Sequence, residues 1–228
     1  MKIFFTQPSH RLSIDGRQIL KRLDFRNWKE TYSNKPSRRN LIIIANGSPD
    51  HIAIIILLHL LNHREVVDMA FPKHKHLAII DYIPKYMEED YENIILIIDQ
   101  ETLKITEIHN HIKNKLNPNQ YEENKDLNNR LAKAIITHGN RKATLYITIN
   151  GIEDKRFTKH TIEDHLLKLA EKKGLIKIKE KTDPKETWKN LGKEKQEKIL
   201  KAIKESEIYE IFPQQVEAII ISHIDILV

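Results

Sequence analysis

The 228-residue sequence contains no cysteine. A disulfide framework and a thiolate zinc site are therefore both excluded, and a bound metal would need oxygen or imidazole ligands. Glycine and proline are sparse, at 6 and 8 residues, so neither a fibrous repeat nor a disordered chain is indicated. Because disulfides are impossible, we expect a cytoplasmic protein.

Long hydrophobic runs are also missing. The most apolar stretch, Ile52 to Leu61, is far shorter than the roughly 20 residues that a helix needs to cross a bilayer. Residues 1–9 have no basic region followed by an apolar segment, which is the pattern of a secretory signal. We therefore expect no membrane partner.

The composition is that of a soluble globular protein, with 40% hydrophobic and 31% charged residues. The net charge of +6 is compatible with attraction to nucleic acid, but also with solvated helix faces that serve only solubility. Abundant isoleucine and lysine, together with the absence of cysteine, resemble the composition of heat-adapted proteins.

Apolar segments alternate between strand and helix patterns up to about residue 175. We predict an α/β domain over residues 1–175, with an open, mainly parallel Rossmann-like sheet flanked by helices and a leading βα element in residues 1–40. Residues 176–228 are predicted to form a small, mainly helical C-terminal extension. The expected strands are Lys2–Thr6, Leu41–Ala45, Glu65–Met69, Leu77–Ile80, Asn93–Ile98, Thr144–Ile149 and Ile176–Lys179. The expected helices cover 12–23, 50–62, 103–116, 127–135, 161–174, 192–206 and 216–221.

Polar side chains follow the predicted central strands. Asn46 and Asp50 follow the first, Asp99 and Glu101 follow the second, and an acidic pair begins the helix after the third. Because the carboxyl ends of parallel strands meet at one sheet edge, these groups are expected to gather there. Carboxylates at alternate positions, as in Asp-Gln-Glu, suit Mg²⁺. The candidate metal ligands are Asp99, Glu101, Asn46, Asp50 and Asp164, and the candidate catalytic residues are Asp99, Glu101 and Glu163.

Each of these residues also has a structural interpretation. Asp99 and Glu101 are suited to the start of a helix, where acidic side chains meet the helix dipole favourably. Asn46 suits a turn, and Asp50 suits the first turn of a helix. Glu163 and Asp164 suit a helix cap. Both interpretations remain open from the sequence alone.

Candidate nucleic-acid contacts lie in two polar loops. Arg38 and Arg39 follow Pro36, and Lys73 and Lys75 alternate with histidines in Pro72 to His76. The simpler interpretation of both segments is solvated surface. A metal site at the histidines is disfavoured because the neighbouring lysines would repel a divalent cation.

An apolar strand followed by Asn46-Gly47-x-x-Asp50, and a later strand ending in Asp99-x-Glu101, resembles the Toprim domain. That family carries Glu-Gly-x-x-Asp after its first strand and Asp-x-Asp after a later one. The resemblance covers roughly Leu41 to Leu169 and is nearest to small Toprim-like proteins related to OLD-family nucleases. It implies a Mg²⁺ site, with Glu163 and Asp164 matching a further acidic pair, and action on nucleic acid.

Two positions depart from the family pattern. Asn46 replaces the first glutamate, and an amide offers neither a charged ligand nor a proton acceptor at neutral pH. Glu101 replaces the second aspartate and retains a carboxylate. Two functions are therefore open: Mg²⁺-dependent phosphodiester cleavage by a nuclease with a degenerate site, or a non-catalytic module that binds nucleic acid or protein.

A third hypothesis is a regulator that contains a winged helix. The segment from His165 to Asp183 resembles a recognition helix followed by a wing strand, with lysines placed for phosphate contacts. A predicted strand at Thr144–Ile149 lies where the upstream helices of a winged helix would be. This hypothesis therefore ranks below the two Toprim-like ones.

Overall fold

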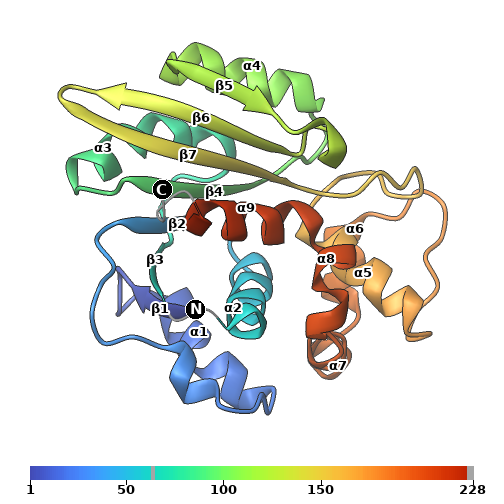
Figure 1. The fold of residues 1–228 in the computed structure, drawn as a ribbon. Helices are drawn as coiled ribbons and strands as arrows, with labels where there is room; N and C mark the ends of the chain where they lie inside the picture. Colours follow the sequence, from blue (N-terminus) through green and yellow to red (C-terminus); the bar gives the residue numbers. More distant parts are fainter. Residues whose placement is uncertain (63–64, 225–228) are drawn as a thin grey trace.

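The computed structural model describes residues 1–62 and 65–224, and it shows one seven-stranded sheet with helices on both faces (Figure 1). The strand order is β1-β3-β2-β4-β7-β6-β5. The first five strands in this order are parallel, while β6 pairs antiparallel with both β7 and β5. The strands are β1 (Lys2–Phe5), β2 (Asn40–Ile44), β3 (Val66–Ala70), β4 (Asn93–Asp99), β5 (Gln120–Glu123), β6 (Leu131–His138) and β7 (Arg141–Asn150). The predicted open, mainly parallel α/β sheet is confirmed.

The two strands that are apolar on both faces lie next to each other near the middle of the sheet. Every residue of β2 and of β4 is buried. Alternate side chains of these strands enter two hydrophobic cores, one on each face, as the two-residue period of a strand requires. This explains why continuous isoleucine-rich runs, rather than alternating ones, mark the centre of the fold.

Helices cover the two faces unequally. One core is closed by α3 (Ile83–Glu88) and α4 (Ile105–Leu116), and the other is closed by the remaining helices. Those are α1 (Arg11–Arg22), α2 (Asp50–Leu61), α5 (Ile162–Lys172), α6 (Pro184–Asn190), α7 (Lys193–Lys201), α8 (Ile208–Ile211) and α9 (Pro213–Ile224). Short 3₁₀ turns at Trp28–Thr31, His76–Tyr82, Lys125–Leu127 and Glu205–Glu207 complete the elements. The predicted helices at 50–62, 103–116 and 161–174 are confirmed within a few residues.

Three secondary-structure predictions are wrong. The expected helix over 127–135 is largely strand β6, whose pairing with β7 overrides a weak helical spacing of leucine and isoleucine. The expected strand at Leu77–Ile80 lies in a 3₁₀ helix. No strand forms at Ile176–Lys179.

The third error removes the structural basis of the winged-helix hypothesis. Its wing strand is absent from residues 176–179, and most residues of its recognition helix, α5, are buried. A recognition helix must instead present a face to the DNA groove.

The region predicted as a C-terminal extension contributes to the main core. Trp188, Ile199, Phe212 and Ile219 join the same core as α1, α2 and α5. Helix α9 lies along β7 and β4 (Figure 1). Residues 225–228 of that region lie outside the described part of the chain. Within the described ranges, no helix has both the length and the apolar character needed to cross a bilayer.

Candidate metal centre

The topology creates a crevice at the carboxyl ends of β2 and β4. From β2 the chain continues to β3 on one side, whereas from β4 it continues through β5 and β6 to β7, all of which lie on the other side. Neighbouring strands whose connections leave in opposite directions form a switch point, where the loops separate and ligands commonly bind in open α/β sheets. The Asn46–Asp50 turn and Asp99 lie at this point.

Three buried carboxylates meet in the crevice. Asp50 is the first residue of α2, Asp99 is the last residue of β4, and Glu163 lies in the first turn of α5. Each offers one oxygen, and these oxygens lie within 4.8 Å of one another. Opposite oxygens around one Mg²⁺ are about 4.2 Å apart and around one Ca²⁺ about 5 Å apart. The acidic cluster, defined as Asp50, Asp99 and Glu163, therefore has the spacing of ligands that can share one metal ion.

A lysine lies at the edge of the acidic cluster. The ammonium of Lys185, in the first turn of α6, is 3.0 Å from Asp99 Oδ2 and also pairs with Glu101. Glu101 is not one of the three converging carboxylates. Its backbone has a φ of 55° and exchanges two hydrogen bonds with His160, so its side chain is directed to Lys185.

Two asparagines orient the acidic cluster. Asn150 ends β7 in register with Asp99, and its Nδ2 donates to Asp99 Oδ1 at 3.0 Å and to Asp50 Oδ1 at 2.9 Å. Asn46 Nδ2 donates to the same Asp50 oxygen at 3.4 Å. Glu163 Oε2 is buried and has no hydrogen-bond partner in the structure. A buried oxygen without a hydrogen-bond donor is free to contact a metal ion.

Burial disfavours the ionised form of all three acids. It raises the pKa of Asp50 well above its usual range, and the charges of Asp99 and Glu163 add to this effect. Burial also raises the pKa of Asp99, although Lys185 opposes the shift. Burial and the Asp99 charge raise the pKa of Glu163 from 4.5 to about 7. A bound cation would supply the positive charge that lowers these values again.

The charged form of Lys185, unlike that of the three acids, is favoured in the crevice. Burial disfavours its charge, but attraction to Asp99 and Glu101 outweighs this, so the pKa of Lys185 is raised above its ordinary value. Lys185 is therefore an ammonium ion at neutral pH. The Lys185 ammonium pairs with Asp99 and Glu101, so it does not neutralise all the acids of the crevice.

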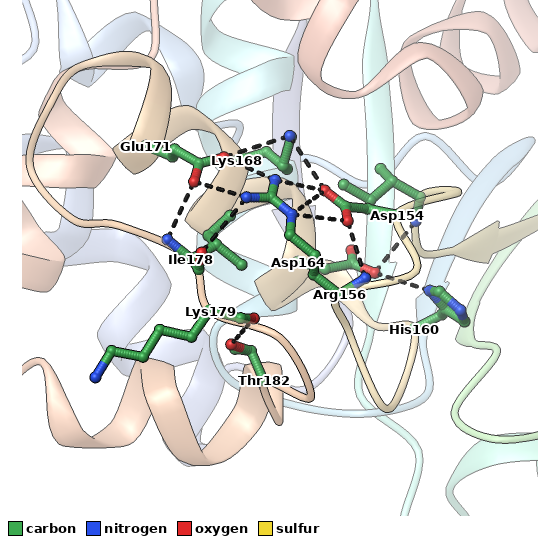
Figure 2. A network of polar contacts seen from close by, with 10 residues as sticks. Asp154, Arg156, His160, Asp164, Lys168, Glu171, Ile178, Lys179 and Thr182 are labelled. Carbon is green, nitrogen blue, oxygen red and sulfur yellow. Dashed lines mark hydrogen bonds and ion pairs between the residues drawn. The ribbon is translucent and has the colours of Figure 1, made fainter.

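A polar network joins the loops on either side of α5. Figure 2 shows Arg156 between Asp154 and Glu171. Its Nη2 is 2.7 Å from Asp154 Oδ2 and 2.8 Å from Glu171 Oε2. Glu171 Oε1 in turn accepts from the Ile178 N–H at 3.1 Å. These bonds tie the loop before α5, at Asp154 and Arg156, and the loop after it, at Ile178, to Glu171 of α5.

Gly151 allows the chain to leave β7 close to this network. Its φ is +121°, and an added Cβ would lie 2.5 Å from the Cβ of His160. Only glycine satisfies both requirements without strain. The close approach brings residues 160–163 beside the end of β7 and thereby places Glu163 in the crevice.

The other sequence candidates lie outside the acidic cluster. Asp164 caps α5: its Oδ2 accepts from the backbone N–H groups of Ile152 at 3.2 Å and Thr161 at 3.4 Å, which agrees with its structural interpretation. Arg38 and Arg39 precede β2 and so lie at the opposite sheet edge, where Arg39 pairs with Glu92 at 2.7 Å. Lys73 and Lys75 follow β3 and are exposed on the same edge as the acidic cluster.

The helix-start interpretation of Asp99 and Glu101 is wrong. Helix α4 begins at Ile105 and is capped by Lys104, so neither acid is in its first turn. The helix-start interpretation of Asp50 and Glu163 is correct as to position, since both lie in first turns. Their side chains nevertheless converge on Asp99, and a position in the first turn of a helix does not by itself require this convergence.

Sequence reasoning missed Lys185 and Asn150. Lys185 is one of many lysines in the C-terminal third, and Asp183-Pro184 before it indicates a turn from the sequence, whereas the structure begins α6 there. Asn150 directly follows the predicted strand at Thr144–Ile149, where the sequence marks it only as the end of that strand. Asn150 and Asp99 both stand at the ends of predicted strands, so they would meet if those strands were parallel neighbours. The sequence does not show which strands are neighbours.

The fold and the crevice define an α/β protein with a buried acidic cluster at the switch point of its sheet. Comparison with protein-family models, with curated proteins and with solved structures gives no match to this chain. The resemblance to the Toprim domain therefore stays a prediction from short motifs.

Proposed function

We propose that this protein is a Mg²⁺-dependent enzyme that cleaves phosphodiester bonds in nucleic acid. The observation that carries the proposal is the acidic cluster, whose three buried carboxylates converge within 4.8 Å at the switch point. Hard carboxylate oxygens are the ligands that Mg²⁺ prefers. The Toprim-like spacing of Asp50 and Asp99 supports the same conclusion from the sequence.

The energetics of the acidic cluster argue for a function. Three carboxyl groups buried together stabilise the fold poorly, because each must be desolvated and their charges repel. Asp50 is 2% exposed and has no cation within ion-pair distance in the described part of the chain. Such a group of acids is expected where a cation compensates for the charge.

Each residue has a distinct role in this proposal. Asp50, Asp99 and Glu163 would hold the ion, and Asn150 keeps the first two directed toward it. A bound Mg²⁺ supplies Lewis-acid stabilisation of the charge that develops on a phosphate. Lys185 lies at the rim, half-buried, where its ammonium can contact a phosphate oxygen.

The proposed substrate class is supported by charge and by position. The chain carries a net charge of +6, and Lys73 and Lys75 are exposed at the edge that holds the acidic cluster. Lysines around an acidic metal site attract a polyanion while the metal engages one phosphate. Arg38 and Arg39 lie at the other edge and have no role in this proposal.

The proposal is tested by incubating the metal-free protein with labelled DNA and RNA oligonucleotides, single- and double-stranded. We expect cleavage when Mg²⁺ or Mn²⁺ is added and none in excess EDTA. Electron paramagnetic resonance of added Mn²⁺ measures the occupancy of the site in the same samples. Cleavage at full rate in EDTA, or the absence of Mn²⁺ binding, would contradict the proposal.

The Lys185→Met variant separates metal binding from phosphate contact. Removing the ammonium removes a like-charge repulsion, so we expect Mn²⁺ affinity to rise by a factor on the order of 10. Cleavage should fall about 10²-fold, because a charge that stabilises the phosphate is lost. Lys189→Met is the control, since Lys189 is exposed on the same helix. Loss of Mn²⁺ affinity in Lys185→Met would show that Lys185 supports the fold of the site instead.

A non-catalytic nucleic-acid-binding module is the second candidate, and one contact favours it. Asn46 occupies the position of the family's glutamate, and its amide donates to Asp50 rather than adding a negative charge. This candidate predicts binding that weakens steeply as salt rises, because phosphate contacts release counterions. It also predicts no turnover with any divalent cation. A fluorescence-anisotropy titration at several salt concentrations, run beside the cleavage assay, distinguishes the two candidates.

A further inference from the structure

Two glutamines begin the last helix of the described chain. Gln214 and Gln215 follow Pro213 at the start of α9 and are 2% and 1% exposed. Glutamine is seldom so completely buried, because its amide must then find partners inside the protein. Both side chains reach the end of β7, which lies beside the acidic cluster.

Gln214 holds the backbone at this point. Its Nε2 lies 3.3 Å from the carbonyl oxygen of Ile149 and 3.1 Å from that of Gly151. These residues flank Asn150 on either side. Gln214 therefore fixes the main chain from which the Asn150 side chain projects.

Gln215 contacts the Asn150 side chain itself. Gln215 Nε2 donates to Asn150 Oδ1 at 2.8 Å. Asn150 Nδ2 then donates to both Asp50 and Asp99. A chain of hydrogen bonds thus runs from α9 through Asn150 to two of the three acids.

The direction of these bonds is determined by chemistry. In the ionised state that binds a cation, a carboxylate only accepts hydrogen bonds, so Asn150 then turns its NH₂ group toward Asp50 and Asp99. Its carbonyl oxygen then faces Gln215 and needs a donor. An asparagine amide is almost symmetric in shape, and only its hydrogen-bond partners distinguish its two orientations. Gln215 supplies the donor that stabilises the orientation the acids require.

We propose that Gln215 is a positioning residue for the acidic cluster. By donating to Asn150, it keeps Asp50 and Asp99 converged before a cation arrives. The inference rests on the proposed function in that the converged acids are the metal ligands named above. Partners behind the direct ligands commonly change metal affinity 10- to 100-fold in this way.

The burial of Gln215 agrees with this role. Its Oε1 is buried and has no hydrogen-bond partner, so the side chain is not fully satisfied where it lies. A buried amide with an unsatisfied oxygen lowers the stability of the fold. The hydrogen bond that its NH₂ group donates to Asn150 explains why a glutamine occupies this position.

The experiment uses the full-length protein with Gln215→Glu and Gln215→Met. Glutamate has the same shape but turns acceptors toward Asn150, and methionine keeps the volume without a donor. We expect both variants to bind Mn²⁺ about 10-fold more weakly, as measured by paramagnetic resonance. The control is Gln196→Glu, because Gln196 is a helical glutamine whose Nε2 donates to the Trp188 carbonyl at 2.7 Å, in α7.

A second measurement tests the hydrogen bonds without metal. In ¹H–¹⁵N spectra of the metal-free protein, the side-chain NH₂ signals of Asn150 should shift in both Gln215 variants and stay unchanged in Gln196→Glu. Circular dichroism establishes that each variant is folded. If Gln215→Met does not fold, the shape-conserving Gln215→Glu alone decides.

The two proposals fail in different ways. If the wild type binds Mn²⁺ and both folded Gln215 variants bind it equally well, the positioning role is overturned while the proposed function stands. If the wild type binds no Mn²⁺, the proposed function fails, and the NH₂ signals of Asn150 still test the positioning role. Unchanged signals in both variants would overturn it.

Discussion

Replacing Asp99 with asparagine is expected to lower metal-dependent cleavage by a factor on the order of 10³, and to weaken Mn²⁺ binding in parallel. Both oxygens of Asp99 have a contact in the crevice: one accepts from Asn150 and the other faces Lys185. Asparagine preserves the shape but removes the negative charge that a divalent cation needs. The measurement is the initial rate on a labelled oligonucleotide at saturating Mg²⁺.

The matched control is Asp126→Asn. Asp126 is exposed in a 3₁₀ turn remote in sequence from the crevice, so its loss of charge should leave the rate unchanged. Equal rates for the Asp99→Asn variant and the wild type would remove the acidic cluster from the reaction.

The metal-free protein is expected to lose stability as pH rises toward neutrality, and Glu163 should account for a large part of the loss. The pKa of Glu163 is 4.5 ordinarily and about 7 in the fold. An acid whose pKa is raised by folding binds more protons in the native state than in the unfolded state between those two values. Its contribution is therefore complete below pH 4.5 and is lost as pH rises through 7. The difference corresponds to about 3 kcal/mol in the free energy of unfolding.

Urea denaturation in EDTA at pH 5 and pH 8 measures this effect. Glu163→Gln cannot ionise, so its free energy of unfolding should fall less between the two pH values than that of the wild type. Glu122→Gln, at an exposed position of β5, is the control and should follow the wild type. Added Mg²⁺ should stabilise the wild type more at pH 8 than at pH 5, because the ion binds the ionised acids. An equal pH dependence in wild type and Glu163→Gln would contradict the assigned pKa.

Most of the sheet was predictable because its central strands carry an unambiguous signal. The runs at 41–45 and 94–98 are apolar at every position, and a strand buried on both faces has this pattern. The secondary-structure prediction failed for β6, where one face of the strand is more buried than the other and pairing with β7 determines that a strand forms. In β6 the buried residues include Ala132, Ala134 and Ile136, whose two-residue period was hidden by flanking apolar residues that fit a helix equally well.

The acidic members of the site were also visible in the sequence. Asp50, Asp99 and Glu163 follow predicted strands or begin predicted helices, and acids at such positions converge in parallel sheets. The residues that orient them carried no comparable signal. Lys185, Asn150 and Gln215 come from three different elements, and each is an ordinary polar residue in its own segment.

The sequence by itself determined that the chain is an α/β protein without disulfides, and that its acids lie at the ends of apolar strands. These properties follow from local patterns, since composition, periodicity and turn chemistry act over a few residues. Only the tertiary structure decided which acids meet. Strand order placed Asp99 beside Asn150, the close approach at Gly151 brought Glu163 inward, and α9 supplied Gln215. Those contacts depend on packing between segments far apart in the chain, and no local pattern encodes that packing.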